Sequence, residues 1–205
     1  MNLQVLPLAV TMMAGPQIMS AIIFVTAERV VPVSLAFIAG VAIAATLGTV
    51  ITTLLAGALS LGSPSDAGST GSVIQYVLVG LLVLAAVKTY LGRETAEPPK
   101  FLGRLQTADP TLAFRAGFLL ILLFPSDVLV LLTVGINLEQ SGSGLSDALP
   151  FIAATTAIAA LPLLAYVLFG RRAREAMPKV REWMNANSWV VNIIACLVFI
   201  VLILG

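Results

Sequence analysis

Six long apolar runs constrain this chain more than any other feature of its sequence. A helix that crosses the hydrocarbon core of a bilayer needs about 20 such residues. The mean hydropathy is +1.04 and only 10% of the residues are charged, whereas a soluble domain is about a quarter charged. We therefore expect an all-α integral membrane protein with six transmembrane helices. The runs are Leu3–Ala27, Val33–Leu59, Val73–Leu91, Ala113–Ile136, Ala148–Phe169 and Trp189–Leu204.

The positive charges lie in alternate connectors between these runs. All 11 Lys and Arg residues are in or beside the first, third and fifth connectors, and the other connectors and both ends of the chain have none. With six crossings, the odd-numbered connectors share one side of the membrane, and the positive-inside rule makes that side the cytoplasm. We therefore expect a multi-pass protein of the cytoplasmic membrane, with its basic loops in the cytoplasm and both termini extracytoplasmic.

The fifth connector carries the densest charge and has the pattern of a membrane-surface segment. Its basic residues are interspersed with apolar ones such as Met177, Val180 and Trp183, which is typical of helices that lie against anionic lipid. Topology alone would also place these charges there, so lipid binding is one of two explanations. The basic residues that we expect to face membrane lipids are Arg171, Arg172, Arg174, Lys179 and Arg181.

Proline interrupts the first and fourth runs near their middles. The first contains Ala14-Gly15-Pro16-Gln17 and the fourth contains Phe124-Pro125-Ser126-Asp127. Proline lacks an N–H, so it frees the carbonyl four residues earlier, and that group must find another partner inside a membrane. We expect the two breaks to face each other near mid-membrane and to form a polar substrate- or ion-binding site. Its residues would be Gly15, Pro16, Gln17, Pro125, Ser126 and Asp127.

Asp127 is the acidic residue at this expected site. A carboxylate at bilayer depth costs several kcal/mol, so it suggests a functional role. We expect it to titrate during a transport cycle, coupling efflux to proton uptake, or to pair with a cationic group of the substrate. The alternatives are a protonated packing residue or a surface anchor, and each proline could simply kink a packed helix.

The two halves of the chain align with each other. Pro16 corresponds to Pro125, and Phe37-Ile38-Ala39 corresponds to Phe151-Ile152-Ala153. A repeat of three helices inserts upside down the second time, and inverted repeats with broken helices are typical of secondary transporters. We expect one membrane domain in which residues 1–92 form the first repeat, 93–112 a cytoplasmic linker and 113–205 the second repeat.

Small residues recur at every fourth position of the second run, which predicts a close helix–helix contact. They are Ala36, Gly40, Ala44, Gly48, Thr52 and Ala56.

Several classes of function find no support in the composition. The chain has no His and a single cysteine, Cys196, so the residues that dominate transition-metal sites and thiol chemistry are nearly absent. It has no basic domain for a nucleic acid and no phosphate-binding loop for ATP. We expect no metal, no cofactor, no catalytic residues and no enzymatic activity.

The motif Ala14-Gly15-Pro16-Gln17, followed by Phe37-Ile38-Ala39-Gly40, resembles the first half of exporters of the LysE superfamily. The stretch from Met177 to Met184 is similar to the tail of its GAP family, named for glycopeptidolipid addressing. The resemblance implies six helices in two inverted halves, often a homodimer, and export of small or lipid-linked solutes. Phe124 departs from the Asn that usually precedes the second proline, and Asp127 replaces a residue that is often Lys.

These observations predict a secondary active transporter that exports a small polar, amphipathic or lipid-linked solute by alternating access. A non-transporting membrane scaffold with a closed helical core is the alternative. An intramembrane enzyme is a further one, with little support from a single carboxylate.

Overall fold

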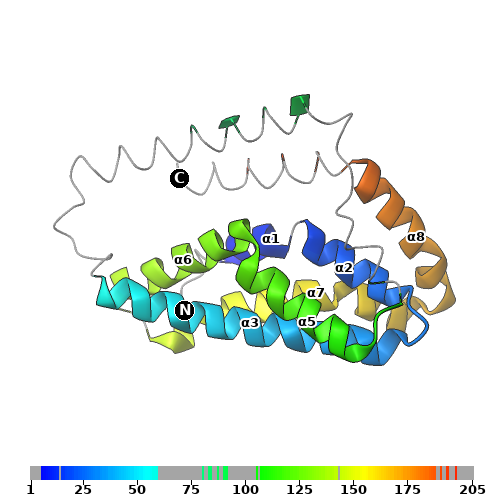
Figure 1. Ribbon diagram of the computed structural model, residues 1–205, viewed down its shortest axis with the longest axis horizontal. Helices are drawn as coiled ribbons and strands as arrows, with labels where there is room; N and C mark the ends of the chain where they lie inside the picture. Colours follow the sequence, from blue (N-terminus) through cyan, green and yellow to red (C-terminus); the bar gives the residue numbers. More distant parts are fainter. Residues whose placement is uncertain are drawn as a thin grey trace.

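The part of the chain that the computed structural model describes is mostly helical and contains no β-strand. It comprises residues 6–13, 15–59, 80, 83–84, 87, 90–91, 105, 107–142, 144–187, 190, 193 and 197. The elements, labelled as in Figure 1, are α1 (Leu6–Met13), α2 (Pro16–Val25), α3 (Val30–Ala58), α5 (Pro110–Leu123), α6 (Pro125–Gln140), the short 3-10 helix η4 (Leu145–Ala148), α7 (Leu149–Phe169) and α8 (Arg171–Ala186).

Two helical stretches are long and apolar enough to cross a membrane, namely α3 and the stretch from η4 through α7. The pair α5 and α6 would form a third span, bent by 65° at its break. The helix α2 is apolar but shorter. The chain is therefore a helical membrane protein, and the second, fourth and fifth predicted runs correspond to α3, to α5 with α6, and to α7.

The third and sixth predicted runs, Val73–Leu91 and Trp189–Leu204, lie mostly outside the described residues. The six-helix arrangement and the division at residues 92 and 113 therefore remain predictions. So does the extracytoplasmic position of the two termini.

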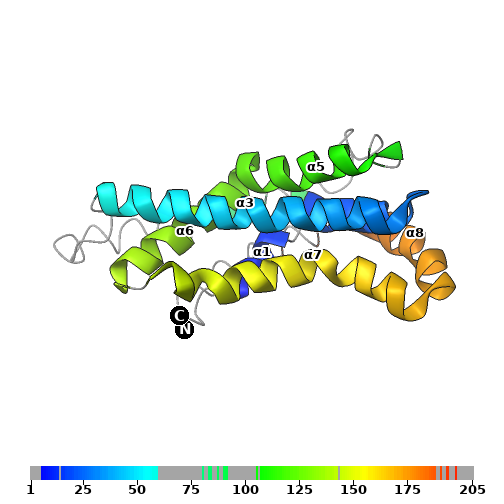
Figure 2. The same ribbon diagram turned by 90° about the horizontal axis from the view of Figure 1, so that it is seen from below.

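The long helices α3 and α7 run along the length of the molecule, and the broken helices pack between and beside them (Figures 1 and 2). Both α5 and α6 pack against α3, whereas α1 and α2 pack mainly against α7. Each long helix therefore contacts the broken helix from the other half of the chain. The helix α8 turns away from α7 at one end of the molecule and packs against α2 (Figure 1).

The contact between α3 and α5 brings the two backbones together. A Cβ atom on Gly40 would collide with the carbonyl oxygen of Phe114, and one on Gly117 would collide with the carbonyl oxygen of Phe37. The contact is thus reciprocal and depends on two residues without side chains, as in close-packed membrane helices.

Further along, α3 is joined to α6 by a hydrogen bond and by a second close approach. The single hydroxyl proton of Thr52 is shared between the carbonyl oxygen of Leu131 on α6 and that of Gly48 on its own helix, both 2.8 Å from Oγ1. A Cβ on Gly135 would lie 2.6 Å from the Thr52 hydroxyl oxygen. The small residues predicted to form a contact strip are buried except for Ala36, which is half-buried. The prediction of a tight contact along this strip is confirmed.

Candidate functional site

The first helix break is formed around Gly15. The helix α1 ends at Met13, and α2 begins with Pro16 at its first position. Between them, Gly15 has φ +118° and ψ −143°, a conformation essentially restricted to glycine. Proline at the first position of a helix is favourable because its missing N–H has no intrahelical partner there. The interruption therefore comes from the pair Gly15–Pro16.

The second break has a different local structure. The helix α5 ends at Leu123, Phe124 is extended with φ −74° and ψ 124°, and α6 begins with Pro125. The carbonyl oxygen of Phe124 accepts hydrogen bonds from the backbone N–H groups of Asp127 and Val128, both at 3.0 Å. This is a full interruption with a 65° bend, so the prediction of a broken helix is confirmed here.

The two breaks meet through their polar side chains. Gln17 Nε2 donates a hydrogen bond to Asp127 Oδ2, although the two residues are 110 positions apart. Gln17 has no exposed surface and Asp127 is 1% exposed. Gln17 is the second residue of α2 and Asp127 the third of α6, so two helix N-termini adjoin the carboxylate.

The other oxygen atoms of the pair differ in their partners. Asp127 Oδ1 accepts a hydrogen bond from the Ser126 hydroxyl at 3.3 Å. Gln17 Oε1 is buried and has no hydrogen-bond partner among the described residues. A buried acceptor without a partner is costly, so this oxygen could accept a hydrogen bond from a hydroxyl, an ammonium group or water.

The structure brings some of the predicted site residues together and separates others. Gly15, Gln17 and Asp127 are buried at the junction, and Pro16 is half-buried. Pro125 and Ser126 are exposed on the outer side of α6. The site residues that contact each other are therefore Gln17 and Asp127, and the Gly15 backbone lies next to Gln17 Oε1.

Other buried polar groups near the helix axes were not predicted as site residues. Ser20 Oγ donates to the carbonyl oxygen of Pro16 at 2.7 Å, which supports the first turn of α2. On α3, the hydroxyl groups of Ser34 and Thr49 are buried without a partner among the described residues. In the sequence, Ser34 and Thr49 are distinguished only as hydroxyl residues inside an apolar run, which does not indicate a site. No group of three His, Cys, Asp or Glu residues in the described part of the chain could hold a metal ion.

The described basic residues belong to segments at one end of the molecule. The turn between α2 and α3 contains Arg29, α5 begins nearby, and α8 follows α7 at the same end (Figures 1 and 2). A cavity of about 220 Å³ at this end is lined by Glu28, Arg29, Thr107, Ala108 and Asp109. Asp109 also caps α5, because its side chain accepts a hydrogen bond from the Leu112 N–H at 2.7 Å.

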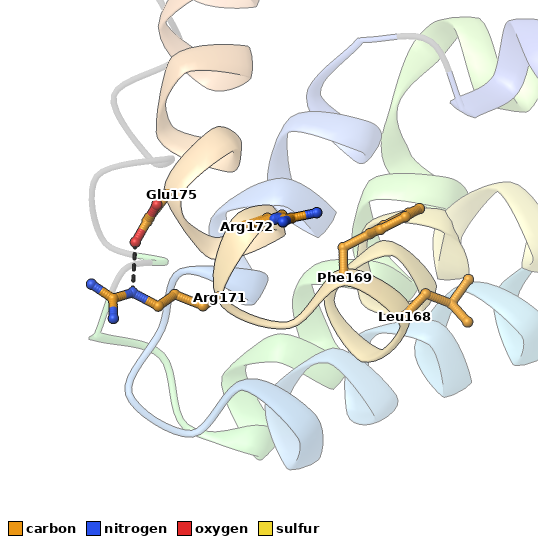
Figure 3. A pocket seen from close by; sticks show the side chains of 5 residues that line it. All are labelled: Leu168, Phe169, Arg171, Arg172 and Glu175. Atoms are coloured by element: carbon orange, nitrogen blue, oxygen red, sulfur yellow. Dashed lines mark hydrogen bonds and ion pairs between the residues drawn. The ribbon is translucent and has the colours of Figure 1, made fainter.

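The predicted lipid-facing residues lie on α8. Arg171 pairs with Glu175 at 2.8 Å, and Figure 3 shows Arg172 extending away from this pair toward the side of Phe169. Arg172 and Lys179 are exposed. The side chains of Arg174 and Arg181 lie outside the described part.

Comparison with known proteins identifies the family of this chain. No individual protein of curated function and no solved structure matches it. The resemblance to a lipid-addressing family of the GAP type is supported at the family level, whereas nothing places the chain in the LysE superfamily. The model of the family described as Sap, sulfolipid-1-addressing protein, matches residues 5–205, and the chain therefore belongs to that family.

Proposed function

We propose that this chain is a secondary active transporter that exports an amphipathic, lipid-linked solute across the cytoplasmic membrane. The observation that carries the proposal is the buried hydrogen bond between Gln17 and Asp127, which joins two broken helices. Broken helices with polar groups at their inner ends are how secondary transporters build sites at mid-membrane. A carboxylate buried at such a place has a large energetic cost.

The packing supports an arrangement of two halves in inverted orientation. The helix α3 of the first half contacts α5 and α6 of the second, and α7 of the second half contacts α1 and α2 of the first. This exchange of partners is expected when two equivalent repeats face each other about an axis in the membrane plane. The Gln17–Asp127 bond then lies between the two groups of helices.

This arrangement suggests how the bond could take part in transport. We propose that α3, α5 and α6 move as one group, because backbone contacts and the Thr52–Leu131 bond hold them together. The group of α1, α2 and α7 moves against it, and Gln17 separates from Asp127 when the site opens. A hydroxyl or ammonium group of the solute would then donate a hydrogen bond to Gln17 Oε1, which has no partner among the described residues.

Proton coupling would act on the same bond. An ionised carboxylate accepts a charge-assisted hydrogen bond from the Gln17 amide, which is stronger than a neutral one. A proton on Asp127 turns the carboxyl group into a donor as well. Proton uptake would therefore weaken the link between the two groups of helices and favour their separation.

The family description supplies the first substrate to test. It names a sulfolipid for the family, so we propose a sulfolipid as the solute, with a sulfated glycolipid as the first probe. The chain would be reconstituted in liposomes with a fluorescent sulfated glycolipid and, in parallel, with the matched lipid without sulfate. Dithionite bleaches only the labelled lipid in the outer leaflet. Under an imposed pH gradient, lipid that the protein moves from the inner to the outer leaflet is therefore seen as a further loss of fluorescence.

The variant Asp127→Asn preserves the shape of the side chain and removes its ionisation. We expect it to abolish the part of the transport that depends on the pH gradient. Arg115→Gln, an exposed charge on α5 outside the junction, serves as the control and should transport at the wild-type rate. If the wild-type chain moves neither lipid, it is a scaffold and not a transporter of this class.

A further inference from the structure

The corner between α7 and α8 combines features of a lipid-binding surface. The chain reverses direction at Gly170, which has φ +52°, at the end of a helix long and apolar enough to cross a membrane. A depression of about 560 Å³ at this corner is lined by Leu168, Phe169, Arg171, Arg172 and Glu175. Its volume lies within the range of small-molecule sites, which is about 300–1,000 Å³.

The last turn of α7 contributes exposed apolar surface to the corner. Leu168 is 75% exposed and Phe169 is 64% exposed. Apolar side chains at the end of a transmembrane helix remain exposed at little cost when acyl chains cover them, and the end of such a helix lies near the level of the headgroups. Phe169 is therefore placed where acyl chains end and headgroups begin.

The charges at the corner are divided unequally. Arg171 is bound to Glu175, so these two residues together contribute almost no net charge to the depression. Arg172 has no hydrogen bond or ion pair to any residue in the described part of the chain. Figure 3 shows Arg172 on the same side as Phe169 and Arg171 turned toward Glu175. Among the described residues, one guanidinium group without a charged partner therefore lies beside apolar surface.

The same pattern continues along α8. Arg172, Lys179 and Trp183 are spaced by seven and four residues, which places them on one side of a helix. Lys179 is exposed and, within the described part, has no partner, and Trp183 is 57% exposed. Ala173 is buried and Met177 packs against the core, so the other side of α8 is attached to the protein.

We propose that the α7–α8 corner and this side of α8 bind the headgroup of an anionic membrane lipid. Arg172 contacts the phosphate, Lys179 adds a second charge along the helix, and Leu168 and Phe169 contact the start of the acyl chains. Arginine suits this role because its planar fork donates two parallel hydrogen bonds to a phosphate. The proposal does not depend on transport, so Asp127→Asn should leave lipid binding unchanged.

The experiment is native mass spectrometry of the full chain in detergent, with phosphatidylglycerol and phosphatidylcholine of equal chain length as probes. We expect the wild type to retain phosphatidylglycerol preferentially. The variant Arg172→Gln should lower its apparent affinity about fivefold, the effect of one basic residue near a headgroup. Arg115→Gln removes the same charge from α5 at the same end of the molecule and should change the affinity less than twofold.

Two further variants separate a specific site from a loss of folding. Glu175→Gln releases Arg171 from its pair, so it should raise the affinity for phosphatidylglycerol, a gain that misfolding does not produce. The double variant Arg171→Gln with Glu175→Gln leaves the net charge and Arg172 in place, and it should bind like the wild type.

Three results would overturn the proposal. One is equal retention of the two lipids by the wild type, and another is wild-type affinity in Arg172→Gln. The third comes from soluble glycerol phosphate at the same concentration. If it displaces the lipid completely, the corner is a site for free anions, because a lipid site also holds the acyl chains through Leu168 and Phe169.

Discussion

The two helix breaks perform the same task with different local structures. The first uses Gly15 at positive φ, is buried except at the half-buried Pro16, and presents an amide through Gln17. The second uses an ordinary extended residue, Phe124, is exposed at Pro125 and presents a carboxylate through Asp127. Two breaks that each contain a proline therefore need not share a mechanism of interruption. The first break depends on backbone conformation, and the second depends on the proline.

Gly15→Ala should have the largest effect on stability. The φ and ψ of Gly15 are essentially restricted to glycine, so alanine should lower the free energy of unfolding by about 3 kcal/mol. The new Cβ would lie 3.4 Å from Gln17 Oε1, so the cost would come mainly from the backbone. The loss of unfolding free energy is measured by unfolding both proteins in mixed micelles with increasing dodecyl sulfate. Phe124→Leu at the second break should lower the free energy of unfolding by about 1 kcal/mol or less. Equal losses in Gly15→Ala and Phe124→Leu would contradict the view that only the first break depends on a special backbone conformation.

Gln17→Leu comes next, because it leaves a buried carboxylate without its partner. We expect a loss of about 2 kcal/mol in the same unfolding experiment. The double variant Gln17→Leu with Asp127→Val replaces both partners by apolar groups, which should recover most of this loss. A double-mutant cycle measures the coupling. Simple additivity of the two single variants would show that the two breaks are not linked through this bond.

Pro125→Ala should change geometry more than stability. Restoring the N–H at this position allows α5 and α6 to approach one continuous helix, with a change in stability of about 1 kcal/mol or less. Spin labels at the exposed positions Leu119 and Thr133 should report a longer distance than in the wild type, in a background where Cys196 is replaced by Ser.

Pro16→Ala is the matched test at the first break. Gly15 already interrupts the helix there, so labels at the exposed positions Val10 and Arg29 should report an unchanged distance. A similar lengthening in both variants would show that proline is the cause of both breaks.

The smallest effect is expected for Ser126→Ala. The Ser126 hydroxyl is exposed and its bond to Asp127 is long, at 3.3 Å, so the loss should be below about 0.5 kcal/mol. Ser20→Ala at the first break removes a bond of 2.7 Å from a buried hydroxyl and should cost about 1 kcal/mol. If Ser126→Ala lowered the free energy of unfolding more than Ser20→Ala, the exposed side of α6 would be the side that stabilises the junction.

The positions of both breaks could be predicted from the sequence, but proline alone would have predicted too many. Pro162 lies inside α7 and Pro178 inside α8, and both helices continue through them. A proline can be accommodated when neighbouring helices hold the segment, and α7 packs against α1, α2 and α3. Whether a helix breaks or continues is thus decided by packing, which the local sequence does not contain.

The side chains that form the junction were harder to predict than the breaks. Gln17, Ser126 and Asp127 all follow a proline, yet only Gln17 and Asp127 face each other. The directions of Ser126 and Asp127 depend on the 65° bend between α5 and α6, and that of Gln17 depends on the break between α1 and α2. Both are properties of the packed protein. The small-residue strip on α3 was easier to predict than the junction, because helical periodicity alone places its members on one face.

The reciprocal contact of Gly40 and Gly117 limits how this protein can evolve. Each residue already has the smallest possible side chain, so a larger residue on one helix cannot be compensated by a smaller residue on the other. The register between α3 and α5 is therefore fixed against single substitutions. Substitutions are accepted more readily where α7 packs against α1 and α2, because those contacts are made by side chains that can be exchanged gradually.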